Sequence, residues 1–226
     1  MMLKIRQSIL MFVIAASVLA GCSKKSTEPA ETQPKFPVFT LTSPAAASDT
    51  CGGPAYAYVT QIRALLQSSA IFAILPGQNV NGVWTWQFPV DGMTIKLTSQ
   101  LQSNGTYQWL LLWNGTDTTT QVTYTNWKSL EGNSSADGKS GTMTIYDDTD
   151  PTSQTILMSI SWTTQASGTL EATIDYYSGG DPSTRIILVS NANGSGEITE
   201  FTWTGAWVPT GYHATWTGEG ATAVCS

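Results

Sequence analysis

The chain has 226 residues and a formal net charge of −6. Charged residues make up only 12% of it, whereas about 25% is usual in soluble domains. Its ten lysines and arginines are scattered, which excludes the basic surface that nucleic-acid-binding proteins carry. The length fits one folded domain, and the nine tryptophans and eight tyrosines favour strands over helices.

The N-terminus has the layout of an export signal. Lys4 and Arg6 supply a positive start, and an apolar run of about twelve residues follows, from residue 9 to residue 20. A run of this length is typical of a signal peptide and is too short to span a bilayer comfortably.

The motif Leu19-Ala20-Gly21-Cys22 closes this run and resembles the lipobox of bacterial lipoproteins at all four positions. The resemblance implies a signal peptide over residues 1–21, cleavage before Cys22, and lipidation of that cysteine. More than one lipid chain on one residue gives stable anchoring. Ser23 follows in place of aspartate, a pattern that in well-studied Gram-negative lipoproteins does not mark inner-membrane retention. We therefore expect a lipid-anchored protein of the cell envelope, at the outer membrane; an ordinary secretory signal with a chance cysteine is the alternative.

The next segment, residues 22–47, is polar and rich in proline. Such a composition buries too little apolar surface to fold, so we expect a flexible tether followed by a single domain over residues 48–226. Phe36 and Leu41, with Val38 and Phe39 between them, are apolar exceptions that could dock as a short edge strand.

Three cysteines are present, an odd number that calls for an explanation in an exported protein. If the lipid occupies Cys22, then Cys51 and Cys225 remain. The compartment permits a disulfide between them, with two free thiols or a metal pair as alternatives. We expect the disulfide, which would tie the start of the helix to the last strand.

A single helix is predicted over residues 56–75. Val59, Ile62 and Leu66 recur at helical spacing, and Pro76-Gly77 ends the segment. We expect a buried core helix whose last turn, residues 71–75, is the most deeply buried part.

Short alternating runs separated by turn signals follow from residue 82 to the C-terminus, the pattern of an antiparallel meander. Asn104-Gly105 is the strongest hairpin signal, because both positions of a type I′ turn favour positive φ. The predicted strands cover residues 83–90, 93–101, 107–113, 122–129, 141–147, 155–163, 170–177, 185–190, 197–204, 212–218 and 221–225.

An open antiparallel sheet of about ten or eleven strands must curl or close. The predicted fold is therefore mainly β: a strongly curved sheet or barrel with the N-terminal helix packed on its concave face. In the order of its elements this looks like the half-barrels of periplasmic lipoprotein-carrier proteins, although no second helical segment is present to serve as a lid.

Two predicted strands are apolar on both faces, residues 107–113 and 186–189, so they need cover on both sides. The helix can cover one side. The tether, a long loop, a partner protein or the membrane surface could cover the other. The candidate ligand-binding residues in the first of these strands are Trp109, Leu110, Leu112 and Trp113.

Motifs for nucleotide binding, metalloproteases and serine hydrolases are absent from the sequence. Asp147, Asp148 and Asp150 form one acidic cluster whose oxygens could hold calcium, although a solvated turn explains them as well. Glu171 and Asp175, with Glu200, are carboxylates of the kind that hydrolyse glycosides, but a solvated outer face is the simpler interpretation.

These observations predict a non-enzymatic envelope lipoprotein that needs no cofactor. It would bind an apolar ligand or a partner protein; the alternative is a carbohydrate-binding or cell-surface adhesion module, because exposed aromatic rows on sheets bind sugars or lipids. Trp84, Trp86, Trp162 and Trp216 are expected to point inward.

Overall fold

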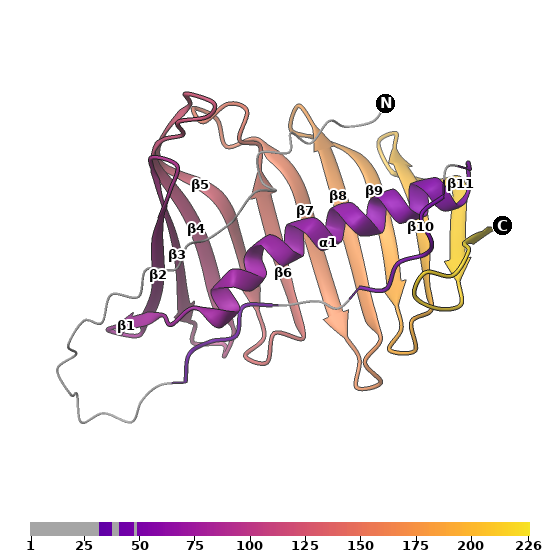
Figure 1. Cartoon of the computed structure of the whole chain (residues 1–226), viewed down its shortest axis with the longest axis horizontal. Helices are drawn as coiled ribbons and strands as arrows, with labels where there is room; N and C mark the ends of the chain where they lie inside the picture. The colour runs from indigo at the N-terminus through magenta and orange to yellow at the C-terminus, as the bar shows by residue number, and fades with distance from the viewer. Residues whose placement is uncertain (1–31, 38–40, 48) are drawn as a thin grey trace.

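The computed structural model describes residues 32–37, 41–47 and 49–226, with the side chains of residues 64–74 left aside. One antiparallel sheet of twelve strands runs in simple meander order from β1 to β12. The single helix α1 (Gly52–Ile74) crosses the concave side of this sheet (Figure 1). The predicted fold class is thus confirmed, and the sheet is curled and open. No helix within the described ranges is long and apolar enough to cross a membrane.

The helix begins four residues before the predicted start, because Asp49 caps it. One oxygen of the Asp49 side chain accepts hydrogen bonds from the N–H groups of Cys51 and Gly52, at 2.9 and 2.5 Å. These bonds satisfy N–H groups that a helix start leaves without partners. The predicted deep burial of the last turn, residues 71–75, falls mostly on side chains outside the described set; Leu75 itself is half-buried.

The strands extend the predicted ones in several places and add β1 at the front. They are β1 (Gln78–Val80), β2 (Val83–Val90), β3 (Met93–Leu101), β4 (Tyr107–Thr116), β5 (Thr123–Ser134), β6 (Ser140–Tyr146), β7 (Ile156–Thr164), β8 (Leu170–Ser178), β9 (Asp181–Ser190), β10 (Gly196–Trp203), β11 (Trp207–Trp216) and β12 (Val224–Cys225).

Two tight turns at the start of the meander have positive φ at both central residues, as type I′ hairpins require. They are Asn81-Gly82 between β1 and β2, and Asp91-Gly92 between β2 and β3. The Asn104-Gly105 hairpin also forms, but its turn type differs from the prediction. Its loop is closed by Gln102 and Thr106, only Gly105 has positive φ, and the Asn104 side chain accepts a hydrogen bond from the Thr106 N–H.

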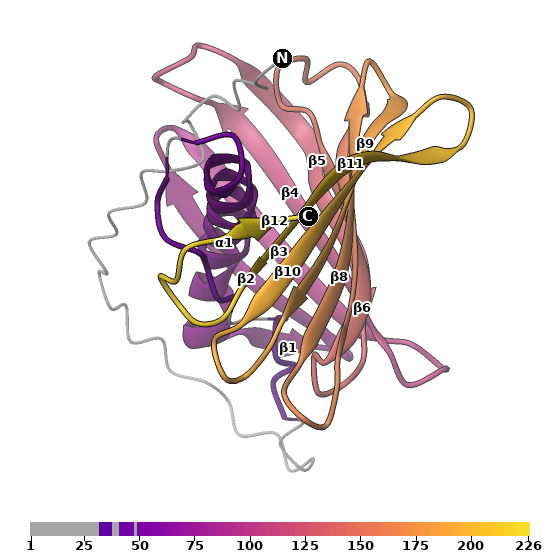
Figure 2. The same ribbon diagram turned by 90° about the vertical axis from the view of Figure 1, so that its right-hand side faces the viewer.

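The sheet curls because of its twist and because of register shifts in four of its strand pairings. β-Bulges or irregularities interrupt the β4–β5, β6–β7, β8–β9 and β10–β11 pairings, and a bulge bends the strand that carries it and increases its twist. Figure 2 shows the result end-on, with α1 inside the curve. We call the side that faces α1 the inner face and the opposite side the outer face.

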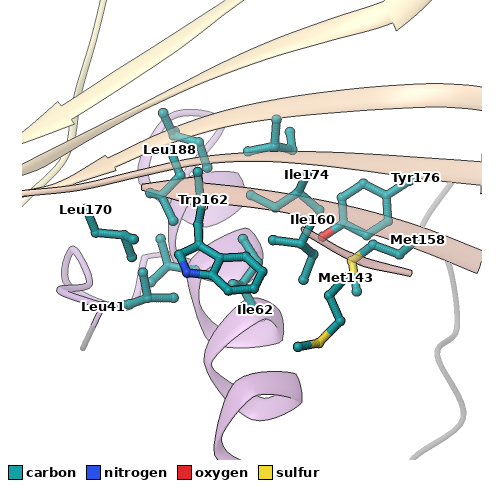
Figure 3. Packing of buried hydrophobic residues seen from close by; sticks show 14 of the residues in the cluster. Leu41, Ile62, Met143, Met158, Ile160, Trp162, Leu170, Ile174, Tyr176 and Leu188 are labelled. Atoms are coloured by element: carbon teal, nitrogen blue, oxygen red, sulfur yellow. The ribbon is translucent and has the colours of Figure 1, made fainter. Parts of the chain in front are cut away.

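The core lies between α1 and the inner face. Alternate residues of the strands point inward, as the period of two requires: in β8, Ala172 and Ile174 are buried. The helix contributes Val59 and Ile62, both almost fully buried. Figure 3 shows Trp162 pointing from the sheet toward the helix, beside Ile62.

The predicted disulfide between Cys51 and Cys225 is present, with 5.6 Å between the two Cα atoms. It joins the start of α1 to β12, across 174 residues of sequence. Because the closed loop is so long, the crosslink restricts the unfolded chain strongly and favours the folded state.

Residues 32–37 and 41–47, here called the N-terminal strap, pack against the domain, although a flexible tether was expected apart from the apolar residues between Phe36 and Leu41. Phe36 and Leu41 are buried, and the described part of the strap forms no strand. The side chain of Gln33 bonds to the Leu75 carbonyl and to the Gly77 N–H, at 3.0 and 2.9 Å. The strap therefore lies along the same side of the sheet as α1 (Figure 1).

Candidate functional site

The inner face at β4 is occupied by the protein itself. Trp109 is fully buried, its indole Nε1 donates a hydrogen bond to Ser134 at 2.9 Å, and Phe36 of the strap packs edge-on against its ring at 4.9 Å. Of the predicted ligand-binding residues, Trp109 is thus part of the core. A ligand could reach it only if the strap moved away.

Trp113 lies four residues further along the same face, against a second buried cluster. Its ring packs against Tyr124 and Trp127, at 5.2 and 5.3 Å. Its Nε1 is buried without a hydrogen-bond partner. Leu110 and Leu112 alternate with these tryptophans and lie half-buried on the outer face. The structure therefore separates the four predicted ligand-binding residues onto two faces.

A groove on the outer face is an open concave feature that the described side chains form. The register places one row of side chains across five adjacent strands: Asn133, Thr142, Ser161, Thr173 and Ile187, each paired with the next. These five residues line an open depression of about 600 Å³. We call it the outer groove.

The outer groove combines hydroxyl groups with apolar surface. Serine and threonine residues make up about half of its lining, while Ile187 and Val189 of β9 give it an apolar end. Glu171 is its single carboxylate, and Gln165 is within 3.5 Å of it. Hydroxyl, amide and carboxylate groups beside apolar surface suit a ligand that is itself rich in hydroxyl groups and has apolar faces.

An ion pair follows next to the groove on the same face. Arg185 and Asp175 lie two residues from Ile187 and Thr173 respectively, and their side chains form two parallel hydrogen bonds of 2.6 and 2.8 Å. This bidentate geometry fixes the guanidinium plane. The bond to Asp175 raises the pKa of Arg185 above its usual value, so the residue is always charged.

The β10–β11 hairpin adds aromatic surface beside this pair. The Arg185 guanidinium lies over the Trp207 ring, 4.4 Å from its centroid, and Trp203 packs edge-on against Trp207 at 5.0 Å. Trp203 is 38% exposed. The outer groove, the ion pair and the two tryptophans thus form one continuous strip on the outer face.

The carboxylates considered for hydrolysis do not act as a pair. Glu171 lines the groove, whereas Asp175 is engaged by Arg185. Glu200 instead contacts the helix, where it accepts a hydrogen bond of 2.7 Å from the Tyr58 hydroxyl. Burial and this hydrogen bond raise the pKa of Tyr58 well above its usual value, so its hydroxyl stays protonated as a donor.

The acidic cluster is a turn in which the aspartates hold the backbone. Asp147 accepts a hydrogen bond from the Thr149 N–H and Asp150 from the Thr152 N–H, both at 2.9 Å. Asp148 has interactions of its own. Across the described ranges, no three acidic, histidine or cysteine side chains come close enough together to hold a metal ion.

In comparisons with known proteins, no family model matches this sequence and no curated protein is similar enough to count as a match. The site must therefore be argued from its own residues. Sequence reasoning missed the Trp203–Trp207 pair because residues 205–211 were taken as a loop. The signal was Trp203-Thr204-Gly205-Ala206-Trp207, two tryptophans placed symmetrically about a turn glycine.

Proposed function

We propose that this chain is a lipid-anchored bacterial envelope protein that works by binding, and that its binding surface is the outer face of the sheet. The observation that carries the proposal is the contrast between the faces. The inner face is covered by α1 and the strap, whereas the outer face has an open groove continuous with exposed aromatic surface.

The anchor rests on the lipobox resemblance at Leu19-Ala20-Gly21-Cys22, which lies outside the described residues. The strap packs on the α1 side of the sheet (Figure 2), so the anchored chain would be attached from that side. A chain tethered through the strap presents its outer face on the opposite side. This arrangement suits a ligand outside the anchoring membrane.

Binding without catalysis fits the arrangement of polar groups. Glycoside hydrolysis needs two carboxylates facing one bond across about 5–10 Å. The outer groove has the single carboxylate Glu171, and neighbouring Asp175 is neutralised by Arg185. An apolar ligand is the weaker candidate, because Phe36, Leu41, Val59 and Ile62 fill the inner face where it would have to lie.

Metabolic labelling with a fatty acid tests the anchor. The wild-type chain should incorporate label and sediment with membranes, and Cys22→Ser should do neither. Labelling that persists in Cys22→Ser would refute lipidation at this residue.

Sedimentation with isolated cell envelopes tests the binding surface. In a Cys22→Ser background, where no lipid anchor can carry the chain down with membranes, Ser161→Arg places a long cation in the outer groove. It should reduce envelope binding about tenfold or more, because it blocks the groove and leaves a charge to desolvate. Gln87→Arg is the matched control, since Gln87 is an exposed outer-face residue of β2 outside the groove. Equal binding by the two variants would contradict the proposed surface.

A further inference from the structure

We infer that the end of the outer-face strip formed by Trp203, Trp207, Arg185 and Asp175 is a subsite for one sugar ring of an uncharged glycan. This inference rests on the proposed function, since it names the ligand class for the same surface. Four properties of the subsite lead to it: the size of its apolar surface, its fixed donors, its charge balance and its position.

The aromatic surface of the subsite is about the size of one ring. Trp203 is exposed, and Trp207, packed edge-on against it at 5.0 Å, holds it in place. Among the other large exposed apolar residues, Val208 lies on the same hairpin and Ile187 in the outer groove, whereas the rest are scattered. A stable protein interface needs a larger apolar centre, with about 800 Å² buried on each partner. A single exposed indole instead matches the C–H face of one sugar ring.

The donors beside the ring are held in advance of binding. Asp175 accepts hydrogen bonds from Nε and one Nη of Arg185, and the ring of Trp207 lies against the guanidinium group. The remaining amino group of Arg185 has no partner among the described residues. A rigid guanidinium–carboxylate pair offers a donor and an acceptor side by side, the arrangement that two neighbouring hydroxyl groups of a sugar require. Because the pair is fixed, little rotamer entropy is lost on binding.

The charges at the subsite cancel, which determines the kind of glycan. Arg185 is the cation that contacts Trp207, and the carboxylate of Asp175 balances its charge, with 2.6 Å between Arg185 Nε and Asp175 Oδ1. The chain as a whole carries a net charge of −6. An acidic polysaccharide would find no free cation here and would be repelled by the protein's overall field. The pair and the ring therefore favour a neutral glycan over an acidic one.

The position of the hairpin separates this ligand from the anchoring membrane. The β10–β11 hairpin projects from the sheet on the side away from α1 (Figure 2), whereas the strap packs on the α1 side. Threonine side chains at 202, 204 and 210 and a glycine at 205 interrupt the apolar residues of the hairpin, so it lacks the contiguous apolar face of a membrane-inserting segment.

Affinity electrophoresis of the mature chain in detergent tests the inference, in native gels that contain mannan, xylan, dextran, mixed-linkage β-glucan or the acidic polysaccharide alginate. At least one neutral polysaccharide should retard the wild-type chain. Trp203→Ala should weaken that retardation about tenfold or more, on the scale of losing one ring stacked on an aromatic side chain. Val208→Ala is the matched control, because Val208 is similarly exposed on the same hairpin.

Unchanged retardation of Trp203→Ala, retardation by alginate alone, or no retardation by any neutral polysaccharide would overturn the subsite. These results are distinguishable from failure of the proposed function. If Ser161→Arg still abolishes binding to cell envelopes while the glycan gels show nothing, the outer face binds a ligand of another class.

Discussion

The two faces of this sheet belong to the same strands but differ in their side chains and in their burial. On the inner face, large side chains meet α1 and the strap, and tryptophans such as Trp109 and Trp162 are buried. On the outer face, the hydroxyl groups of Thr142, Ser161 and Thr173 cross β6 to β8 in a paired row that stays open to solvent. The inner face therefore stabilises the fold, and the outer face is free to be specialised for binding.

Neighbouring residues of one strand give the largest expected contrast. Trp109→Ala should lower the free energy of unfolding by about 3–5 kcal/mol, because it leaves a cavity against Phe36 and an unpaired Ser134 hydroxyl. Leu110→Ala, on the outer face of the same strand, should cost about 1 kcal/mol. Urea unfolding followed by circular dichroism measures both free energies of unfolding. Equal losses in the two variants would mean that the outer face stabilises the fold as much as the inner face does.

The disulfide should be next in size. Replacing Cys51 and Cys225 together with serine should lower the free energy of unfolding by about 2–4 kcal/mol, because the unfolded chain regains the freedom of a closed loop. The reduced wild-type chain should match the double variant. A much larger loss in the variant than on reduction would show that the serines disturb the site where α1 begins.

Glycines of the inner face should be intolerant of even a methyl group. A Cβ atom on Gly196 would lie 2.3 Å from the Trp216 ring and 2.7 Å from the Val189 carbonyl oxygen. Gly196→Ala should therefore cost about 1–3 kcal/mol through overpacking. Gly218→Ala is the control, since open space surrounds that position. Thermal unfolding of the two variants would contradict the account if their midpoints were the same.

The strap should give the smallest effect, one that depends on pH. Burial raises the pKa of Glu219, but Arg63 and the Ser43 N–H, both bonded to its carboxylate, outweigh burial and hold it below its ordinary value of 4.5. The folded state thus favours the ionised form. This stabilisation is present above pH 4.5 and is lost as the pH falls through the lowered pKa. Unfolding midpoints measured from pH 7 down to pH 3 should fall less in Glu219→Gln than in the wild type; parallel curves would exclude this contribution.

Most of the architecture follows from local patterns in the sequence. Alternation in β8 identifies Ala172 and Ile174 as inward-facing, and Asp91-Gly92 marks a tight hairpin turn. The three-cysteine arithmetic identifies the Cys51–Cys225 bridge. Each of these predictions needs only neighbouring residues or a count of cysteines, and a single sequence supplies both.

The candidate site follows from register and from long-range packing, which the sequence does not specify locally. The outer groove exists because β5 to β9 align Asn133, Thr142 and Thr173 in one row. The strap is polar and rich in proline, yet it docks because Phe36 packs against the ring of Trp109, which is far away in the sequence. Composition alone predicts a flexible segment there, and tertiary contacts override it.

Hydroxyl-radical footprinting of the protein, with and without isolated cell envelopes, tests most directly whether the outer face is the binding surface. Bound envelope should protect Trp203 and Ile187 from oxidation and leave the helix-side residues Tyr56 and Tyr58 unchanged. Protection confined to Tyr56 and Tyr58, with Trp203 as reactive as in the free protein, would contradict the account.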